Sequence, residues 1–221
     1  LTFILHLAPA DSAGCGNVCP KATPGCIAAC LNLAGRGGMF TPEQGTNTIQ
    51  EARKRKTRLF FEDRDTFMEQ LEQDINLGIK QAAKKGLTAV FRLNGTSDLS
   101  WEKYHVGGRA NIFELFPDVQ FYDYTKVLGR KVKDIPNYDL TFSAADGNDK
   151  DVAEAIKQGM NVAMVFDKLP ETYMGKTVVD ADEDDLRFLD PKGVIMGLKA
   201  KGRAKKDTTG FVRRVINIKA I

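Results

Sequence analysis

The sequence contains no long apolar run and carries almost no net charge. Hydrophobic residues make up 43% of the 221 residues, charged residues make up 28%, and the formal net charge is +3. A membrane-spanning helix needs about 20 consecutive apolar residues, and no stretch approaches that length, so we expect no membrane partner. The apolar stretch at residues 1–13 lacks the basic flank of a signal peptide and is interpreted as a strand. So small a net charge favours no class of partner.

Cysteine is absent except in one short segment. The four cysteines are spaced C-x3-C-x6-C-x3-C and are Cys15, Cys19, Cys26 and Cys30. Small secreted scaffolds spread their disulfides over the whole fold, so this clustering favours a reducing compartment and a metal site. Soft thiolates suit an iron–sulfur cluster or zinc. Because zinc loops more often use C-x2-C pairs, we favour iron–sulfur, with zinc, disulfides and free thiols as alternatives.

The number of thiolates decides what an iron–sulfur cluster can do. Three thiolates hold a [4Fe–4S] cluster and leave one iron open to a small molecule, whereas a fourth closes the site. The predicted ligands are Cys19, Cys26 and Cys30, and Cys15 is either a fourth ligand or a bystander. Neither of the two histidines lies at ligand spacing from a cysteine.

Apolar runs alternate with helical patterns along the chain. Thr48-x-x-Glu51 resembles a capping box and predicts a helix from about Asn47. Further helices are predicted at residues 65–85, 111–116 and 150–158. Strands are predicted at residues 2–8, 87–93, 119–124, 138–143, 161–166, 176–179 and 193–198, with an extra one at 211–218.

This alternation predicts an α/β fold in a single domain over residues 1–221. Apolar strands joined by crossovers form parallel sheets covered by helices. We therefore expect a partial (β/α) barrel-like parallel sheet of about six strands, with a cysteine loop at residues 9–40 after the first strand. The basic stretch at residues 199–210 is expected to be mobile.

Polar residues follow the carboxyl ends of several predicted strands, where parallel α/β folds collect their ligand sites. Arg92, Asn94 and Asp98 lie at the end of the second strand, and Tyr124 and Lys126 lie at the end of the third. We predict that the first three hold the ribose or carboxylate of a cofactor and that the other two contact an adenine ring or substrate. The structural alternatives are a buried ion pair of Arg92 with Asp98 or Asp123, and packing of the tyrosine.

A glycine-rich run follows the cysteines directly. Gly35, Arg36, Gly37 and Gly38 would let backbone N–H groups approach a carboxylate or phosphate, and Arg36 would pair with the anion. Most glycine-rich turns are purely structural, so this run supports a cofactor site only together with the cysteines.

The order of elements and the cysteine loop after the first strand resemble the radical S-adenosylmethionine superfamily. Its members are full or partial (β/α) barrels in which three cysteines bind a [4Fe–4S] cluster and nearby glycine-rich backbone binds S-adenosylmethionine. Their usual spacing is C-x3-C-x2-C, from which this chain departs with x6 and x3. Over nearly the whole chain, NVCPKATPGCIAACLNLAGRGG, RLNGTSD, FYDYTK and DLRFLDPKGVIMGLKAKG also resemble an uncharacterised bacteriophage protein family.

The first resemblance implies a radical S-adenosylmethionine-type enzyme. The phage family brings no established activity, but it and the basic residues after the last strand favour a nucleotide or nucleic-acid-related substrate. The enzyme's cofactors would be a [4Fe–4S] cluster and S-adenosylmethionine, and it would act in the cytoplasm, that of the host if the chain is phage-encoded. The alternative is a zinc-stapled, non-catalytic phage protein that binds nucleic acid or a host factor. Basic residues between Lys199 and Lys206 would supply phosphate contacts in either case.

Overall fold

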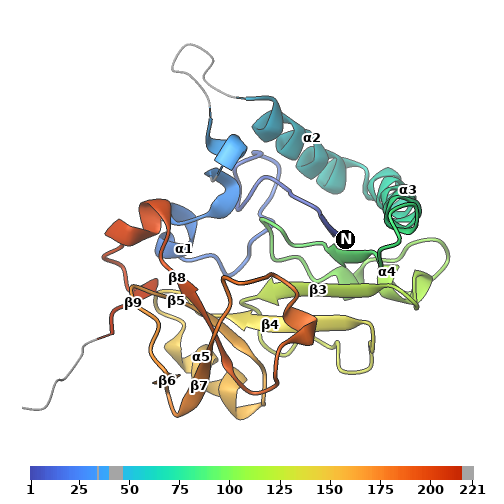
Figure 1. The fold of residues 1–221 in the computed structure, drawn as a ribbon. Coiled ribbons are helices and arrows are strands. Elements are labelled where there is room, and N and C mark those ends of the chain that lie inside the picture. Colours follow the sequence, from blue (N-terminus) through green and yellow to red (C-terminus); the bar gives the residue numbers. More distant parts are fainter. Residues whose placement is uncertain (34, 40–46, 216–221) are drawn as a thin grey trace, which may run out of the picture. The chain divides into compact units, whose positions relative to one another are not determined.

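The computed structural model describes residues 1–33, 35–39 and 47–215 (Figure 1). The chain forms two compact units. Unit 1 comprises Leu1–Lys21, Leu31–Asp123 and Gly129–Asp139. Unit 2 comprises Ala22–Cys30, Tyr124–Leu128 and Leu140–Ile221.

Unit 1 contains parallel strands in the order in which they occur in the chain. Strand β1 (Thr2–Ile4) pairs with β2 (Val90–Arg92), which pairs with β3 (Gln120–Thr125), whose last two residues belong to unit 2. Ile4 is in register with Arg92, and Phe91 with Phe121. All three strands therefore end at the same edge, the edge where loops of parallel α/β folds build their sites.

The helices of unit 1 begin where local caps occur. Helix α2 (Thr48–Glu62) has Asn47 as its N-cap, and the Asn47 side chain accepts a hydrogen bond from the backbone N–H of Gln50. Helix α3 (Arg64–Ala83) is capped by Asp63, which accepts from Thr66 at 3.1 Å. The shorter helical segments of this unit are α4 (Ile112–Leu115), η1 (Leu31–Leu33), η2 (Gly35–Gly38) and η3 (Trp101–Lys103).

An aromatic cluster joins these helices to the loop after β2. The Phe60 ring of α2 makes edge contacts with Phe67 of α3 and with Trp101, at centroid distances of 5.3 and 5.8 Å. The guanidinium of Arg64 lies 3.9 Å above the Phe60 ring. Aromatic pairs at such distances add stability beyond the area that they bury, so the loop after β2 is held firmly against the helices.

Unit 2 contains a second set of mostly parallel strands. Strands β4 (Tyr138–Ser143), whose first two residues belong to unit 1, β5 (Val162–Phe166), β8 (Ile195–Lys199) and β7 (Lys176–Asp180) are neighbours in that order and parallel. The short strand β6 (Thr172–Tyr173) runs antiparallel to β7, and β9 (Val212–Arg213) pairs with the end of β5. The helical segments are α1 (Pro24–Ala28), α5 (Asp149–Lys157), η4 (Arg187–Leu189) and η5 (Gly202–Lys206).

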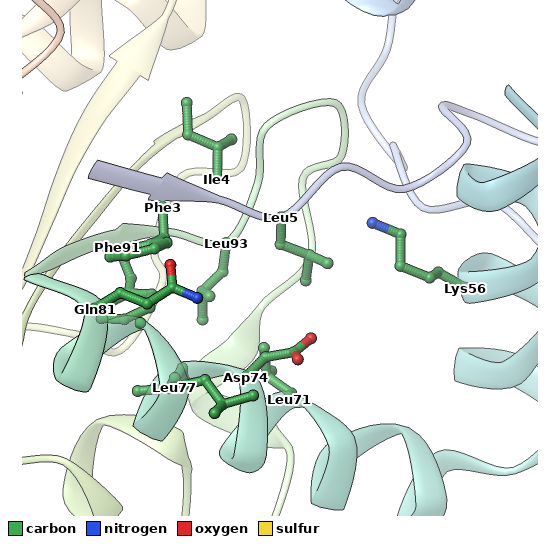
Figure 2. Close-up of a pocket in the computed structure, with 12 residues that line it drawn as sticks. Phe3, Ile4, Leu5, Lys56, Leu71, Asp74, Leu77, Gln81, Phe91 and Leu93 are labelled. Carbon is green, nitrogen blue, oxygen red and sulfur yellow. The ribbon is translucent and has the colours of Figure 1, made fainter. Parts of the chain in front are cut away.

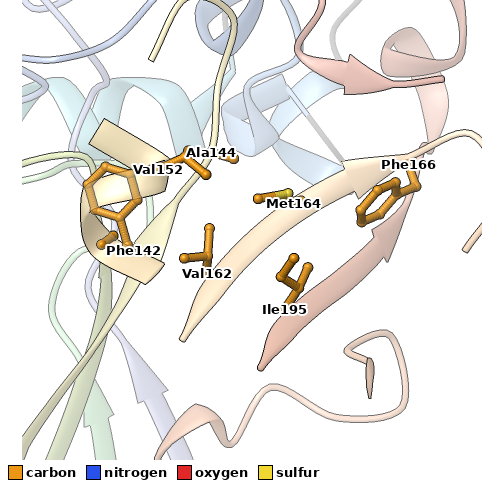
Figure 3. Close-up of a cluster of buried hydrophobic side chains, with 8 residues drawn as sticks. Phe142, Ala144, Val152, Val162, Met164, Phe166 and Ile195 are labelled. Atoms are coloured by element: carbon orange, nitrogen blue, oxygen red, sulfur yellow. The ribbon is translucent and has the colours of Figure 1, made fainter. Parts of the chain in front are cut away.

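Side chains of β4, β5, β8 and α5 form the core of unit 2 (Figure 3). Phe142, Val162, Phe166 and Ile195 are fully buried there, and Val152 of α5 packs against them. Both faces of β5 are covered, so apolar side chains are needed on both. The strand is therefore an almost continuous apolar run and does not alternate between apolar and polar residues.

The predicted α/β class with a mostly parallel sheet is confirmed, and the cysteine loop follows the first strand as expected. In neither unit do the described strands close into a ring, which agrees with a partial barrel. The first strand is shorter than predicted, because β2 ends at Arg92 and the residues after Ile4 lie against the loop that follows it: Gly95 donates to the Leu5 carbonyl and Thr96 donates to the Leu7 carbonyl. The last residues of the predicted strand at 211–218 lie outside the described residues.

Candidate metal and cofactor site

In unit 1 the first cysteines are fixed against the loop that follows β2. The Cys19 thiol donates to the Thr96 carbonyl at 3.7 Å, and its backbone N–H donates to Asn17. The Asp98 N–H donates to the Val18 carbonyl at 2.8 Å. The structure thus brings Cys19 beside the loop that carries Asn94 and Asp98, as parallel pairing of β1 and β2 predicts.

Cys15 has a different environment in the same loop. Burial, together with the carboxylates of Glu62 and Asp11, raises the pKa of the Cys15 thiol. A raised pKa favours the neutral thiol over the thiolate that binds metal.

In unit 2, Cys26 and Cys30 lie in and just after helix α1. Thr23 caps this helix by accepting from the Cys26 N–H at 3.2 Å. Thr23 in turn donates to Asp146, and Asp146 also accepts from the Gly25 N–H at 3.1 Å. Burial opposes ionisation of Asp146, but these hydrogen bonds outweigh it and lower its pKa. A carboxylate from the loop after β4 therefore fixes the helix that carries Cys26.

All four cysteines lie in the described part of the chain, and each is a half-buried, reduced thiol. Cys15 and Cys19 belong to unit 1, and Cys26 and Cys30 belong to unit 2. Among the described residues, no three His, Cys, Asp or Glu side chains form a group that could hold a metal ion. The donor chemistry suits a soft metal, but neither unit alone supplies three thiols.

The glycine run packs closely against α2. The Gly37 carbonyl accepts from Gln50 at 2.6 Å, and a Cβ added at Gly37 would lie 2.6 Å from the Asn32 carbonyl oxygen. Arg53 of α2 also donates to that carbonyl, at 2.8 Å. Close packing therefore explains the glycine at position 37, while Arg36 is exposed.

The residues predicted at the ends of β2 and β3 are held by hydrogen bonds of their own. Asn94 is buried, and its side-chain oxygen accepts from Ser97, from the Leu99 N–H and from Trp101. Arg92 ends β2 and is half-buried. A cofactor contact by the Asn94 amide would require some of these bonds to open.

In unit 2, the Tyr124 hydroxyl donates to Asp185 at 3.0 Å, and Lys126 donates to Ser143 at 3.1 Å. Tyr124 lies near the end of β3, and Lys126 directly follows the strand, so their position at its carboxyl end agrees with the prediction. Ser143 ends β4. These contacts fix the two side chains.

A family model described as "Gene product 88" matches residues 2–215. The chain belongs to the Gene product 88 family. The match confirms the predicted membership in a phage-type protein family, and the link to the radical S-adenosylmethionine superfamily stays a prediction. No curated protein and no solved structure matches the chain. None of the described helices of this Gene product 88 family member is long and apolar enough to cross a bilayer.

Unit 1 of this family member holds a buried polar network around Asp123, and sequence reasoning missed its other members. Asp123 of β3 is fully buried and accepts from the Asn94 N–H at 2.6 Å and from the Tyr138 hydroxyl at 2.9 Å. Arg130 donates to the Tyr138 oxygen and forms a two-bond ion pair with Glu102, at 2.5 and 3.2 Å. Burial raises the pKa of Asp123 to about 7, although its hydrogen bonds and Arg92 act in the other direction.

The signal for this network was the charged residue within an apolar strand. An Asp between Tyr122 and Tyr124 in FYDYT must find partners if it is buried. Arg130 and Tyr138 follow it by 7 and 15 positions, beyond the end of β3 at Thr125, so no strand period connects them to Asp123. The partners therefore become visible only in the fold.

Proposed function

We propose that this chain is an iron–sulfur protein, of the radical S-adenosylmethionine type, in which Cys19, Cys26 and Cys30 share one [4Fe–4S] cluster. The observation that carries the proposal is the reduced cysteine segment that follows β1, the first of a series of parallel strands in chain order. Enzymes built on such strands keep their chemistry at the carboxyl ends. Cys19 already lies at that edge, against Thr96.

Each residue has a role in this proposal. The three thiolates would hold three irons and leave the fourth open, while Cys15 stays a neutral thiol because its pKa is raised. Arg36 and the exposed backbone around Gly35 would contact the carboxylate of S-adenosylmethionine, with Arg92 and Asp98 at the same edge as Cys19. When bound, such a cluster supplies an electron to the sulfonium, and a carbon radical for hydrogen abstraction results.

The substrate in this proposal is a nucleotide or a nucleic-acid-related molecule. Membership in a phage-type family and the exposed cations of η5 (Arg203, Lys205 and Lys206) support it, because such cations suit phosphates. In this proposal Tyr124 would stack on the substrate, and Lys126 would pair with its phosphate.

The test is metal analysis of protein purified anaerobically, with and without S-adenosylmethionine. We expect brown protein with broad absorbance at about 400 nm and about four irons per chain. Cys19→Ala, Cys26→Ala and Cys30→Ala should each remove the colour. Cys15→Ala is the matched control and should retain it; loss of colour in that variant would indicate a four-thiolate cluster with no open iron.

A colourless protein that carries one zinc would contradict the iron–sulfur proposal. It would support the alternative of a zinc-stapled, non-catalytic protein, because reduced, half-buried thiols serve zinc as well as iron. The exposed cations of η5 would then serve binding to nucleic acid alone.

A further inference from the structure

A pocket in unit 1 has no part in the cysteine chemistry. Its volume is about 290 Å³, and it lies between β1, β2 and α3, with Lys56 of α2 at one end (Figure 2). Its walls are mostly apolar and include Phe3, Leu5, Leu71, Ile75, Leu77, Phe91 and Leu93, with Asp74 and Gln81 as further polar groups. All of these residues belong to one unit and are described.

A glycine sets the depth of the pocket. A Cβ added at Gly78 would lie 2.9 Å from the Phe91 ring and 3.2 Å from the Phe3 ring. Helix α3 therefore packs directly on the two stacked rings, whose centroids are 5.2 Å apart. The result is a rigid apolar floor formed by strand side chains and a bare turn of helix.

The Lys56 end of the pocket is electropositive. Burial lowers the pKa of Lys56, the nearby Arg53 lowers it further, and Asp74 acts in the opposite direction. The pKa of His6, the residue after Leu5, is lowered to about 4 by burial and by Arg53, Arg92 and Lys56. Within the part of the chain that the structure describes, no acceptor is hydrogen-bonded to the Lys56 ammonium.

A half-buried ammonium without a hydrogen-bonded acceptor is unfavourable unless an anion or water supplies one. Asp74 is the carboxylate in the lining, but its side chain belongs to an exposed residue and makes no ion pair with Lys56. Lys56 is the cation in the pocket lining, and Arg53 and Arg92 lie near enough to act on the adjacent His6. An anionic group on a ligand fits this end better than a cationic or neutral one.

We propose that this pocket binds a small amphipathic carboxylate. Its apolar body would lie on Phe91 and Leu71, and its carboxylate would accept hydrogen bonds from Lys56. A volume of about 290 Å³ suits a ligand of about ten non-hydrogen atoms. Because no cysteine lines the pocket, the proposal does not depend on whether the chain binds iron.

The test titrates ¹⁵N-labelled full-length protein, with its metal content as purified, with octanoate and with the uncharged octanamide. We expect octanoate to shift the amide signals of Gly78, Leu5 and Phe91 with a Kd on the order of 1 mM. Octanamide should bind about tenfold more weakly, because it lacks the charge that pairs with Lys56.

Two variants and one control separate this site from non-specific binding. Lys56→Met keeps the aliphatic stem and should weaken octanoate about tenfold. Leu77→Glu, at a position that is 54% exposed, puts a negative charge on the pocket wall and should weaken it at least as much. Arg55→Met removes a positive charge from an exposed position of α2 outside the pocket and should change the affinity less than twofold.

Three results would overturn the proposal. Octanamide that binds as tightly as octanoate would mean that Lys56 does not select an anion. Equal weakening by Arg55→Met and Lys56→Met would indicate general attraction to a basic helix. No signal shift at about 10 mM octanoate would show that the pocket takes no such ligand. None of these measurements involves the cysteines. A failure of the pocket proposal can therefore be distinguished from a failure of the iron–sulfur proposal.

Discussion

Asp123 illustrates how a single buried carboxylate can depend on the fold around it. Its oxygens accept from the Asn94 N–H and from the Tyr138 hydroxyl, and no part of the side chain reaches solvent. Burial disfavours the charged form more strongly than these donors favour it, so the pKa of Asp123 is raised to about 7. The protonation of Asp123 is therefore linked to the stability of the folded protein.

The first prediction concerns pH. The unfolded Asp123 carboxyl titrates at its ordinary pKa of 3.8 and the folded one at about 7. Between these values the folded state holds a proton that the unfolded state has lost, so the free energy of unfolding falls as pH rises. The contribution is complete below pH 3.8 and lost above about pH 7, with a slope of at most about 1.4 kcal/mol per pH unit.

Urea unfolding at about pH 5 and about pH 8 measures this slope. Asp123→Asn keeps the shape and removes the titrating group, so its free energy of unfolding should depend less on pH than that of the original protein. Asp118→Asn, at an exposed position of the same unit, is the control and should keep the original slope. Identical slopes for all three proteins would contradict the raised pKa.

The second prediction concerns the buried ion pair of Arg130 and Glu102. Their side chains are 3% and 4% exposed, and the guanidinium donates two hydrogen bonds to the carboxylate. Removing one partner leaves a buried, uncompensated charge, which costs about 3 to 5 kcal/mol. Glu102→Gln should lower the free energy of unfolding by about this amount.

The matched double variant separates the ion pair from simple packing. Glu102→Gln with Arg130→Met buries no unpaired charge and should recover part of the lost stability, which chemical denaturation can measure. Additive losses in the double variant would mean that the two side chains are not coupled, against the geometry of the pair.

At the scale of elements, local caps could be predicted and distant ones could not. Asn47 lies next to the helix that it caps, and the pattern Thr48-x-x-Glu51 predicted that start correctly. Helix α1 is different, because the carboxylate that fixes its first turn is Asp146, more than a hundred residues away. No spacing in the sequence connects the two, so its stabilisation appears only in the fold.

The third prediction tests this distant cap. Gly25 lies so close to Asp146 and Thr209 that an added methyl group would collide with both side chains. Gly25→Ala should therefore destabilise the protein by about 2 kcal/mol in urea unfolding. Ala28→Ser, at an exposed position of the same helix, should stay within about 0.5 kcal/mol. Equal stability of the two variants would mean that α1 does not depend on the close approach of Asp146.

At the scale of the whole molecule, the sequence predicted the helices and strands better than it predicted which side chains contact one another. The strand at 138–143 was predicted with its observed bounds. The helix predicted at 65–85 corresponds to α3, and both of its ends were predicted to within two residues. Strand β6 was missed because two residues carry no detectable period. The position of Asn94 after the second strand was predicted, whereas the hydrogen bonds that occupy its side chain come from Trp101 and Leu99 and appear only in three dimensions.

The charge runs of unit 2 show the same limit. Residues 180–185 form an acidic run and residues 199–206 a basic one, and nothing in their spacing along the sequence pairs the two. In the fold, Lys199 pairs with Asp180 at 2.7 Å, and Lys201 pairs with Asp182 at 2.8 Å. The hydrogen bond from Lys199 raises its pKa and lowers that of Asp180. Two of the five cations in the basic run are therefore already paired.

The last prediction follows from this division and concerns binding to nucleic acid. Arg203, Lys205 and Lys206 are exposed, so they would supply the phosphate contacts if the chain binds DNA or RNA. Changing all three to Ala should weaken binding of a labelled oligonucleotide and reduce the slope of log Kd against log salt by up to about 2.7.

The matched variant changes the paired cations instead. Lys199 and Lys201 changed together to Ala remove charge from the same run, but their carboxylate partners offset much of their field. This variant should alter the salt slope by less than one, because fewer counterions are released when a cation is already neutralised. Equal effects of the two variants would mean that the net charge of the run governs binding and not the exposed η5 cations. If the original protein does not bind the oligonucleotide at all, these cations no longer support a nucleic-acid substrate.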